Sequence, residues 1–146
     1  MQSYKQQQIS WYLLYLFYIP NKHTHMAKYV DGFVIPIAKD KKDAYKKMAR
    51  EGKAAWMKFG ALSYMECRGD DMTPTHVAFT FPKMAKVKEG EEVWFSFITF
   101  NSKKHRDEVN KKVMAYFDKK YAGKNQDMPF DMKRFSYGGF IVEVGA

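Results

Sequence analysis

Asp31 has the clearest potential for chemistry, because it is an acid within a segment that otherwise reads as an apolar strand. Residues 29–37 have the sequence YVDGFVIPI, and alternation along a strand places Asp31 on one face with aromatic and β-branched neighbours. Burying a carboxylate there is costly unless it is paired or reaches water. Asp31 is therefore either a general base lining an interior or a structural carboxylate bonded to Arg134, Tyr137 or a backbone N–H.

Further polar side chains on or beside the predicted strands are candidates for binding a ligand. Tyr64 and Glu66 share a face of one strand, and Glu66 is either a second carboxylate near Asp31 or a solvated residue at the sheet edge. Ser96 lies in the most apolar strand and is either a polar contact or a small packing residue. Arg134 would bind an anionic group, pair with a carboxylate or remain solvated.

Tyr137 begins the segment YGGF and completes the set of candidates. Two glycines inside a strand often mark a bulge or the close approach of a ligand or another backbone, although close packing of a helix or a dimer partner has the same requirement. We therefore predict Asp31 and Tyr137 as catalytic candidates, and Tyr64, Glu66, Ser96 and Arg134 as ligand-binding candidates.

Other kinds of site find no support in the sequence. The single cysteine, Cys67, cannot form a disulfide within the chain and reads as a small buried hydrophobe, and the four histidines show no metal-ligand spacing. Neither a P-loop nor a G-x-G-x-x-G motif is present, so we expect no metal and no cofactor. This sparse use of cysteine favours a reducing, cytoplasmic location.

The pattern of apolar residues predicts four strands and two helices. The strands are expected at 29–37, 61–68, 92–100 and 134–144, and the helices at 41–59 and from Ser102 to before Gly123. Asp40 and Ser102 are predicted N-caps, and Gly60 is a predicted C-terminal stop. Gly52 is a flaw inside the first helix, since it costs roughly 1 kcal/mol relative to Ala.

This order of elements, β-α-β-β-α-β, predicts an α+β fold of the ferredoxin-like type, with both helices on one face of the sheet. Nothing in the chain is left to cover the other face, and the strand at 92–100 is apolar on both sides. An apolar sheet face of this size does not stay exposed to water, so we expect a homodimer, closed sheet against sheet. Residues 72–90 form a long excursion, with a short strand expected at 76–81.

Residues 26–146 are expected to form this single domain, whereas residues 1–25 read differently. The apolar run ISWYLLYLFYI at 9–19 is too short for a membrane-spanning helix and lacks the flanks of a secretory signal. Met26 opens directly onto the first strand, so we interpret residues 1–25 as an upstream extension outside the native protein. An interfacial or signal-like anchor is the alternative, and no membrane association is expected for residues 26–146.

Several blocks of residues also carry a family resemblance. They are KYVDGFV at 28–34, DKKDAY at 40–45, FGAL at 59–62, EC at 66–67, MPFDMKR at 128–134 and YGGF at 137–140. Together they resemble the YbaA-like family, known as domain of unknown function 1428, over residues 26 to about 144. The resemblance implies a dimeric α/β barrel made of two ferredoxin-like subunits, and it implies no reaction because the family has none assigned.

Three functions follow from these patterns. The first is the binding or transformation of a small molecule in a cavity on the sheet or at the dimer interface. The second is RNA or DNA binding by the lysines of the two helices, which equally fit an ordinary solvated surface. The third is a purely structural or interaction role through dimerisation. We favour the first; the net charge of +9 attracts polyanions only weakly, so nucleic acid is the less expected partner.

Overall fold

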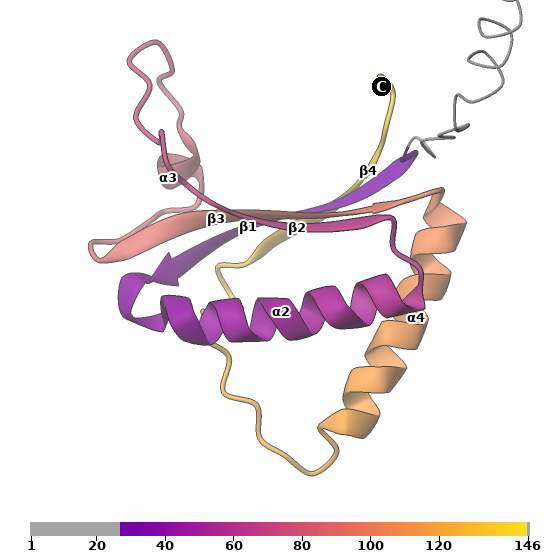
Figure 1. Cartoon of the computed structure of the whole chain (residues 1–146). Coiled ribbons are helices and arrows are strands. Elements are labelled where there is room, and N and C mark those ends of the chain that lie inside the picture. Colours follow the sequence, from indigo (N-terminus) through magenta and orange to yellow (C-terminus); the bar gives the residue numbers. More distant parts are fainter. Residues whose placement is uncertain (1–26, 146) are drawn as a thin grey trace, which may run out of the picture.

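The computed structural model describes residues 27–145, so the interpretation of residues 1–25 lies outside the described part of the chain (Figure 1). The elements are β1 (Tyr29–Ala38), η1 (Lys39–Lys41), α2 (Lys42–Phe59), β2 (Ser63–Arg68), α3 (Phe81–Met84), β3 (Glu91–Phe100), α4 (Lys103–Lys120) and β4 (Ser136–Ile141). The predicted α+β class is confirmed, and each predicted strand of the sheet and both long helices are present.

The four strands form one antiparallel sheet in the order β2-β3-β1-β4. The two longest strands, β1 and β3, are therefore central, whereas β2 and β4 form the edges. Figure 1 shows α2 and α4 together on one side of this sheet. Apolar residues on both faces of β3 agree with its central place in the sheet, where it pairs with β2 along one edge and with β1 along the other.

Two of the three helix ends predicted from capping residues are found in the structure. Gly60 has φ 111° and caps the C-terminus of α2, in the left-handed conformation that glycine adopts without strain. The Oγ of Ser102 accepts a hydrogen bond from the backbone N–H of His105 at 3.1 Å, which confirms Ser102 as the N-cap of α4. The prediction for Asp40 is wrong. Asp40 lies inside the 3-10 turn η1, so its backbone lacks the extended N-cap conformation and Lys41 precedes α2 instead.

The prediction of a short strand at 76–81 is also wrong. These residues do not pair with the described sheet, and Pro82 falls in the first turn of α3, where its fixed φ favours a helix. The last strand is shorter than expected, because its pairing with β1 runs only from Ser136 to Ile141.

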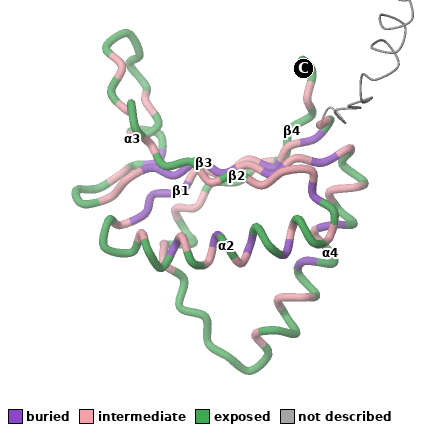
Figure 2. The backbone as a smooth tube through the Cα atoms, in the orientation of Figure 1, coloured by how far each residue is buried: buried purple, intermediate pink, exposed green. Residues whose placement is uncertain are grey.

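The core lies between the sheet and the two long helices. One cluster surrounds Phe100, Val109 and Val113, and a second surrounds Ile37 and Tyr45. Both are built from side chains of the helix-covered face, which alternation along the strands separates from the opposite face. Figure 2 shows the buried positions concentrated in this layer.

The opposite side of the sheet, called here the open face, is mostly apolar. Its one charged strand residue, Glu91 at the start of β3, is paired with Arg134. The other strand residues on this face are Val30, Gly32, Val34, Pro36, Ala38, Ser63, Met65, Cys67, Val93, Phe95, Phe97, Thr99, Ser136, Gly138 and Phe140. Met65 is 48% exposed, Phe95 42% and Phe140 59%. Cys67 is exposed rather than buried as predicted, and it lies on the edge strand β2.

Candidate functional site

Five of the six predicted site residues lie on the helix-covered face, in two adjacent rows across the sheet. From β2 to β4, one row contains Glu66, Ser96, Phe33 and Tyr137, and the other contains Tyr64, Ile98, Asp31 and Gly139. The apolar residues in the middle of these rows divide the polar side chains into two clusters. We call them the Asp31 cluster, toward β4, and the Glu66 cluster, toward β2.

The Asp31 carboxylate is 1% exposed and is held by two side chains of α4. Arg106 Nη1 donates to Oδ1 at 3.0 Å, and Asn110 Nδ2 donates to Oδ2 at 3.2 Å. The Asn110 amide oxygen accepts a hydrogen bond from Trp56 Nε1 at 2.9 Å. Because Trp56 belongs to α2, this chain of bonds connects β1 to both long helices.

The Arg106 guanidinium has further partners within the same cluster. Nη2 donates to the Tyr29 hydroxyl at 3.1 Å, Nη1 donates to the Tyr137 hydroxyl, and Cζ lies 4.9 Å from the centre of the Tyr29 ring. Nε lies 2.8 Å from Asp107 Oδ1, but the carboxylate is not in line with the N–H, so this buried donor has no hydrogen bond. Burial alone would lower the pKa of Arg106, but Asp31, Tyr137, Tyr29 and Asp107 together outweigh it and the pKa is raised.

This arrangement favours a structural role for Asp31. The carboxylate is neutralised by Arg106 and has almost no surface from which to touch a substrate. Tyr137 is half exposed, and burial followed by the charge of Asp31 raises its pKa, so its phenol stays protonated near neutral pH. The stabilising partners come from α4 rather than from Arg134. The spacing of Arg106 and Asn110 places both on the helix face that also carries the core residues Val109 and Val113, and this spacing could have identified them as partners of Asp31.

The Glu66 cluster brings a carboxylate together with three hydroxyl groups. Tyr45 OH donates to Oε2 at 2.6 Å, Tyr64 OH donates to Oε1 at 2.8 Å, and the Ser96 hydroxyl also donates to Oε2. Tyr45 was missed as a site residue, because its helical spacing marks it equally well as a core residue. Gly52 of α2 gives this cluster its space, since a Cβ there would lie 2.8 Å from the Tyr64 hydroxyl.

Glu66 differs from Asp31 in having no basic partner. Among residues 27–145, no Lys or Arg nitrogen lies within 4 Å of its carboxylate. Burial, and then the charge of Glu66, raises the pKa values of Tyr45 and Tyr64, so both phenols remain hydrogen-bond donors. Glu66 itself is partly exposed. A carboxylate has about four acceptor positions, so three donors leave one for another group.

Arg134 is the predicted site residue that the structure keeps apart from both clusters. Its guanidinium binds both oxygens of Glu91, at 2.5 Å through Nη1 and 2.8 Å through Nη2, and Nη2 donates to Lys86 O at 2.7 Å. This bidentate pair joins the segment before β4 to the start of β3. Arg134 therefore has the carboxylate partner that was the alternative to anion binding.

The two glycines before Phe140 make room for rings of this same chain. A Cβ at Gly139 would lie 2.4 Å from the Tyr29 hydroxyl on the covered face. A Cβ at Gly138 would lie 3.3 Å from the Phe140 ring, which also approaches Gly32 on the open face. Close packing of side chains within the chain therefore accounts for both positions.

Comparison with known proteins now agrees with the resemblance carried by the residue blocks. A sequence model of the family described as "Protein of unknown function (DUF1428)" matches residues 28–132. The chain belongs to this family. It is 44% identical over 113 residues to the uncharacterised protein YbaA of Escherichia coli K12, covering 77% of this chain and 94% of the relative. The uncharacterised protein YbaA of Shigella flexneri matches with the same values.

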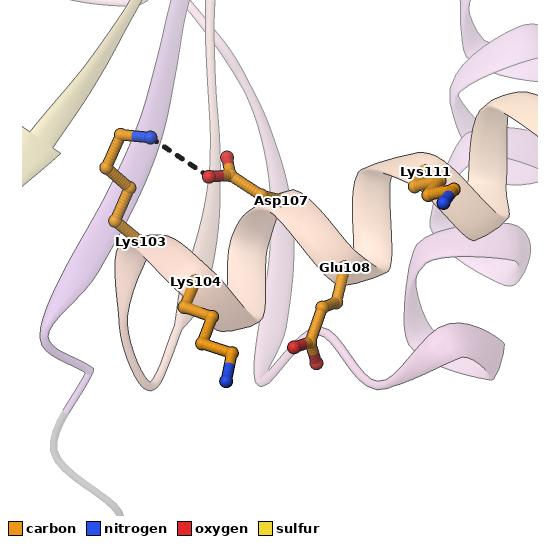
Figure 3. Close-up of a pocket in the computed structure, with 5 residues that line it drawn as sticks. All are labelled: Lys103, Lys104, Asp107, Glu108 and Lys111. Atoms are coloured by element: carbon orange, nitrogen blue, oxygen red, sulfur yellow. Dashed lines mark hydrogen bonds and ion pairs between the residues drawn. The ribbon is translucent and has the colours of Figure 1, made fainter.

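This DUF1428 protein also has a hollow on the exposed surface of α4, with a volume of about 410 Å³ (Figure 3). It is lined by Lys103, Lys104, Asp107, Glu108 and Lys111, and Lys103 pairs with Asp107 at 2.9 Å. Acids interleaved with the lysines reduce the local positive charge, so this part of the basic layer is a weak site for a polyanion.

Two further observations apply to the described part of the chain. None of its helices combines the length and apolar character needed to cross a membrane. Residues 27–145 likewise contain no cluster of three or more His, Cys, Asp or Glu side chains placed to hold a metal ion.

Proposed function

We propose that this protein acts as a homodimer in which two ferredoxin-like subunits close their sheets face to face, forming a dimeric α/β barrel. The order of helices and strands, and the strand order β2-β3-β1-β4, support the plait within each subunit. The observation that carries the assembly is the open face, which is mostly apolar, has Met65, Phe95 and Phe140 exposed, and has Glu91, already paired with Arg134, as its one charged strand residue.

Charge explains why a second copy suits this face. The chain has a net charge of +9, so two copies repel each other through most of their surfaces. The open face presents little charge to be desolvated or repelled, because its one charged strand residue, Glu91, is paired with Arg134, and it buries apolar rings when two copies meet. A two-fold axis brings the same surface from each subunit into contact, which is the commonest symmetry of soluble oligomers.

Light scattering with a matched pair of variants tests this assembly. Met65→Glu adds a charge to the open face, whereas Met114→Glu adds the same charge to α4 at nearly the same exposure, 47% against 48%. We expect the unmodified protein and Met114→Glu to be dimers at micromolar concentration, and Met65→Glu to be a monomer with unchanged circular dichroism. Dimers of equal affinity in all three proteins would contradict the proposal.

A second function, the binding of a small molecule at the Glu66 cluster, is favoured by the lack of a cation beside Glu66. A ligand with an ammonium or guanidinium group would occupy the remaining acceptor position and neutralise the carboxylate. Tyr45, Tyr64 and Ser96 would hold the carboxylate in place for it. Glu66 lies on the edge strand β2 and is partly exposed, whereas Asp31 lies on a central strand and is 1% exposed.

NMR titration tests this second function. Ethylammonium or guanidinium should shift amide signals of β2 and of α2 around Gly52 in the unmodified protein, and the shifts should disappear in Glu66→Gln. Trimethylacetate serves as a control of opposite charge. Shifts of equal size in Glu66→Gln, or shifts confined to the acidic residues of α4, would contradict a site at Glu66.

A further inference from the structure

The excursion at residues 69–90, called here the arm, rises from the sheet on the side opposite α2 and α4 (Figure 1). It therefore stands on the same side as the open face. Its base is held to the sheet: Gly69 N donates to Val93 O at 2.7 Å, Ala85 is buried, and the rings of Phe81 and Phe95 lie 6.5 Å apart. Figure 2 shows that the tip, by contrast, is exposed.

The tip of the arm has the same chemical character as the open face. Residues 74–80 read PTHVAFT and include no acid, lysine or arginine, although 28% of the whole chain is charged. Lys83, from the base of the arm, donates to Ala78 O at 2.6 Å. Val77 is 42% exposed and Phe79 71%. Exposed apolar groups gathered in this way mark a surface that another molecule covers.

Contact by the arm would add to the area that the two sheets can bury against each other. The strands contain 10, 6, 10 and 6 residues. At about 4.8 Å between strands and about 3.3 Å per residue, such a sheet has a flat footprint of about 500 Å². A standard stable interface takes about 800 Å² from each partner. The flat footprint of the sheets is smaller than this figure for accessible surface, so added contact from the arm would bring the interface closer to the standard size.

We propose that the arm of each subunit packs against the partner subunit, extending the interface beyond the two sheets. This inference rests on the proposed face-to-face dimer. An arm that projects on the open-face side meets whatever lies on that face, and the occupant proposed there is a second copy of this chain. Phe79 at the tip would lose its exposure in the dimer, and the apolar side chains of the tip would meet a mostly apolar surface.

Photo-crosslinking from the arm tests the inference in the full-length protein. The crosslinker p-benzoylphenylalanine replaces Phe79 in unlabelled protein, which is mixed with ¹⁵N-labelled protein and irradiated. We expect covalent dimers in which an unlabelled arm peptide is joined to a labelled peptide. The same crosslinker at Met114, on the exposed side of α4, should give no covalent dimer.

The dimer affinity of Phe79→Ser provides a second readout. Phe79 is 71% exposed in the single chain, so this substitution should leave the fold intact by circular dichroism. Burial of a Phe side chain in an interface predicts a dissociation constant at least about tenfold higher. A wild-type dimer with no crosslink between subunits and an unchanged Phe79→Ser affinity would overturn the arm contact alone. A wild-type protein that stays monomeric would overturn both the arm contact and the dimer.

Discussion

The two faces of the sheet differ in what covers their side chains. On the covered face, Asp31 is matched by Arg106 and Asn110 of the same chain, and the surrounding rings are packed by α2 and α4. On the open face, the one charged strand residue, Glu91, is paired with Arg134, and Met65, Phe95 and Phe140 remain exposed. The covered face is therefore completed within one chain, whereas the open face is suited to completion by another.

This comparison also separates polar groups that hold the fold from a polar group that is free to bind. Asp31 and Glu91 each have an arginine partner, so their charges are used within the fold. Glu66 is held by three hydroxyl groups without a cation. A carboxylate on a strand is thus a weak indication of function until its partners are known.

The largest expected effect breaks the covered face at its ion pair. Asp31→Asn leaves Arg106 without its buried counter-charge, and we expect a loss of about 3 kcal/mol in the free energy of unfolding, near the low end for broken buried pairs because Arg106 reaches solvent. Urea denaturation measures this loss. It should be independent of protein concentration in a Met65→Glu background, where the proposed dimer is absent. A loss below about 0.5 kcal/mol would mean that the network contributes little.

The next effect tests how tightly α2 is fitted to the covered face. Gly52→Ala should stabilise an exposed helix by about 1 kcal/mol. Here it should instead destabilise the protein by about 1 to 2 kcal/mol, because the new Cβ would lie 2.8 Å from the Tyr64 hydroxyl. Removing that hydroxyl in the double variant Gly52→Ala/Tyr64→Phe should recover part of the loss. If the single variant is more stable than the unmodified protein, the close fit is not a constraint.

The smallest effect concerns the ion pair at the start of β3. The Arg134 guanidinium lowers the pKa of Glu91 from its usual value of 4.5 to about 2. The pair therefore contributes its full stability above pH 4.5, and the contribution is lost as the pH falls through about 2. The difference in thermal stability between the unmodified protein and Glu91→Gln should shrink over that range. A difference that is constant from pH 6 to pH 2 would contradict the ion pair.

Local patterns were enough to predict much of the architecture but little of the site. Alternation placed Asp31, Tyr64, Glu66 and Ser96 on faces that the structure confirms as shared, and Gly60 and Ser102 act as the predicted helix ends. The error at Asp40 arose because a 3-10 turn and an N-cap attract the same residue types.

The partners of each polar group could not be read from neighbouring residues. Arg106 is 75 residues from Asp31, and Tyr45 is 21 residues from Glu66, so their contacts depend on how helices pack on the sheet. Gly52 appeared to be a flaw because the ring that needs its space belongs to a different element. The arm at residues 69–90 has no period that would predict its exposed, uncharged tip.

The reactivity of Cys67 tests the account most directly, because it is the single cysteine of the chain and lies exposed on the open face. Its rate of alkylation by iodoacetamide would be followed from nanomolar to micromolar protein. We predict a fall in rate as protein concentration rises, with the fast rate retained at every concentration in Met65→Glu. A rate that stays fast at micromolar concentration, in a protein that light scattering shows to be monomeric, would contradict the claim that a second copy covers this face.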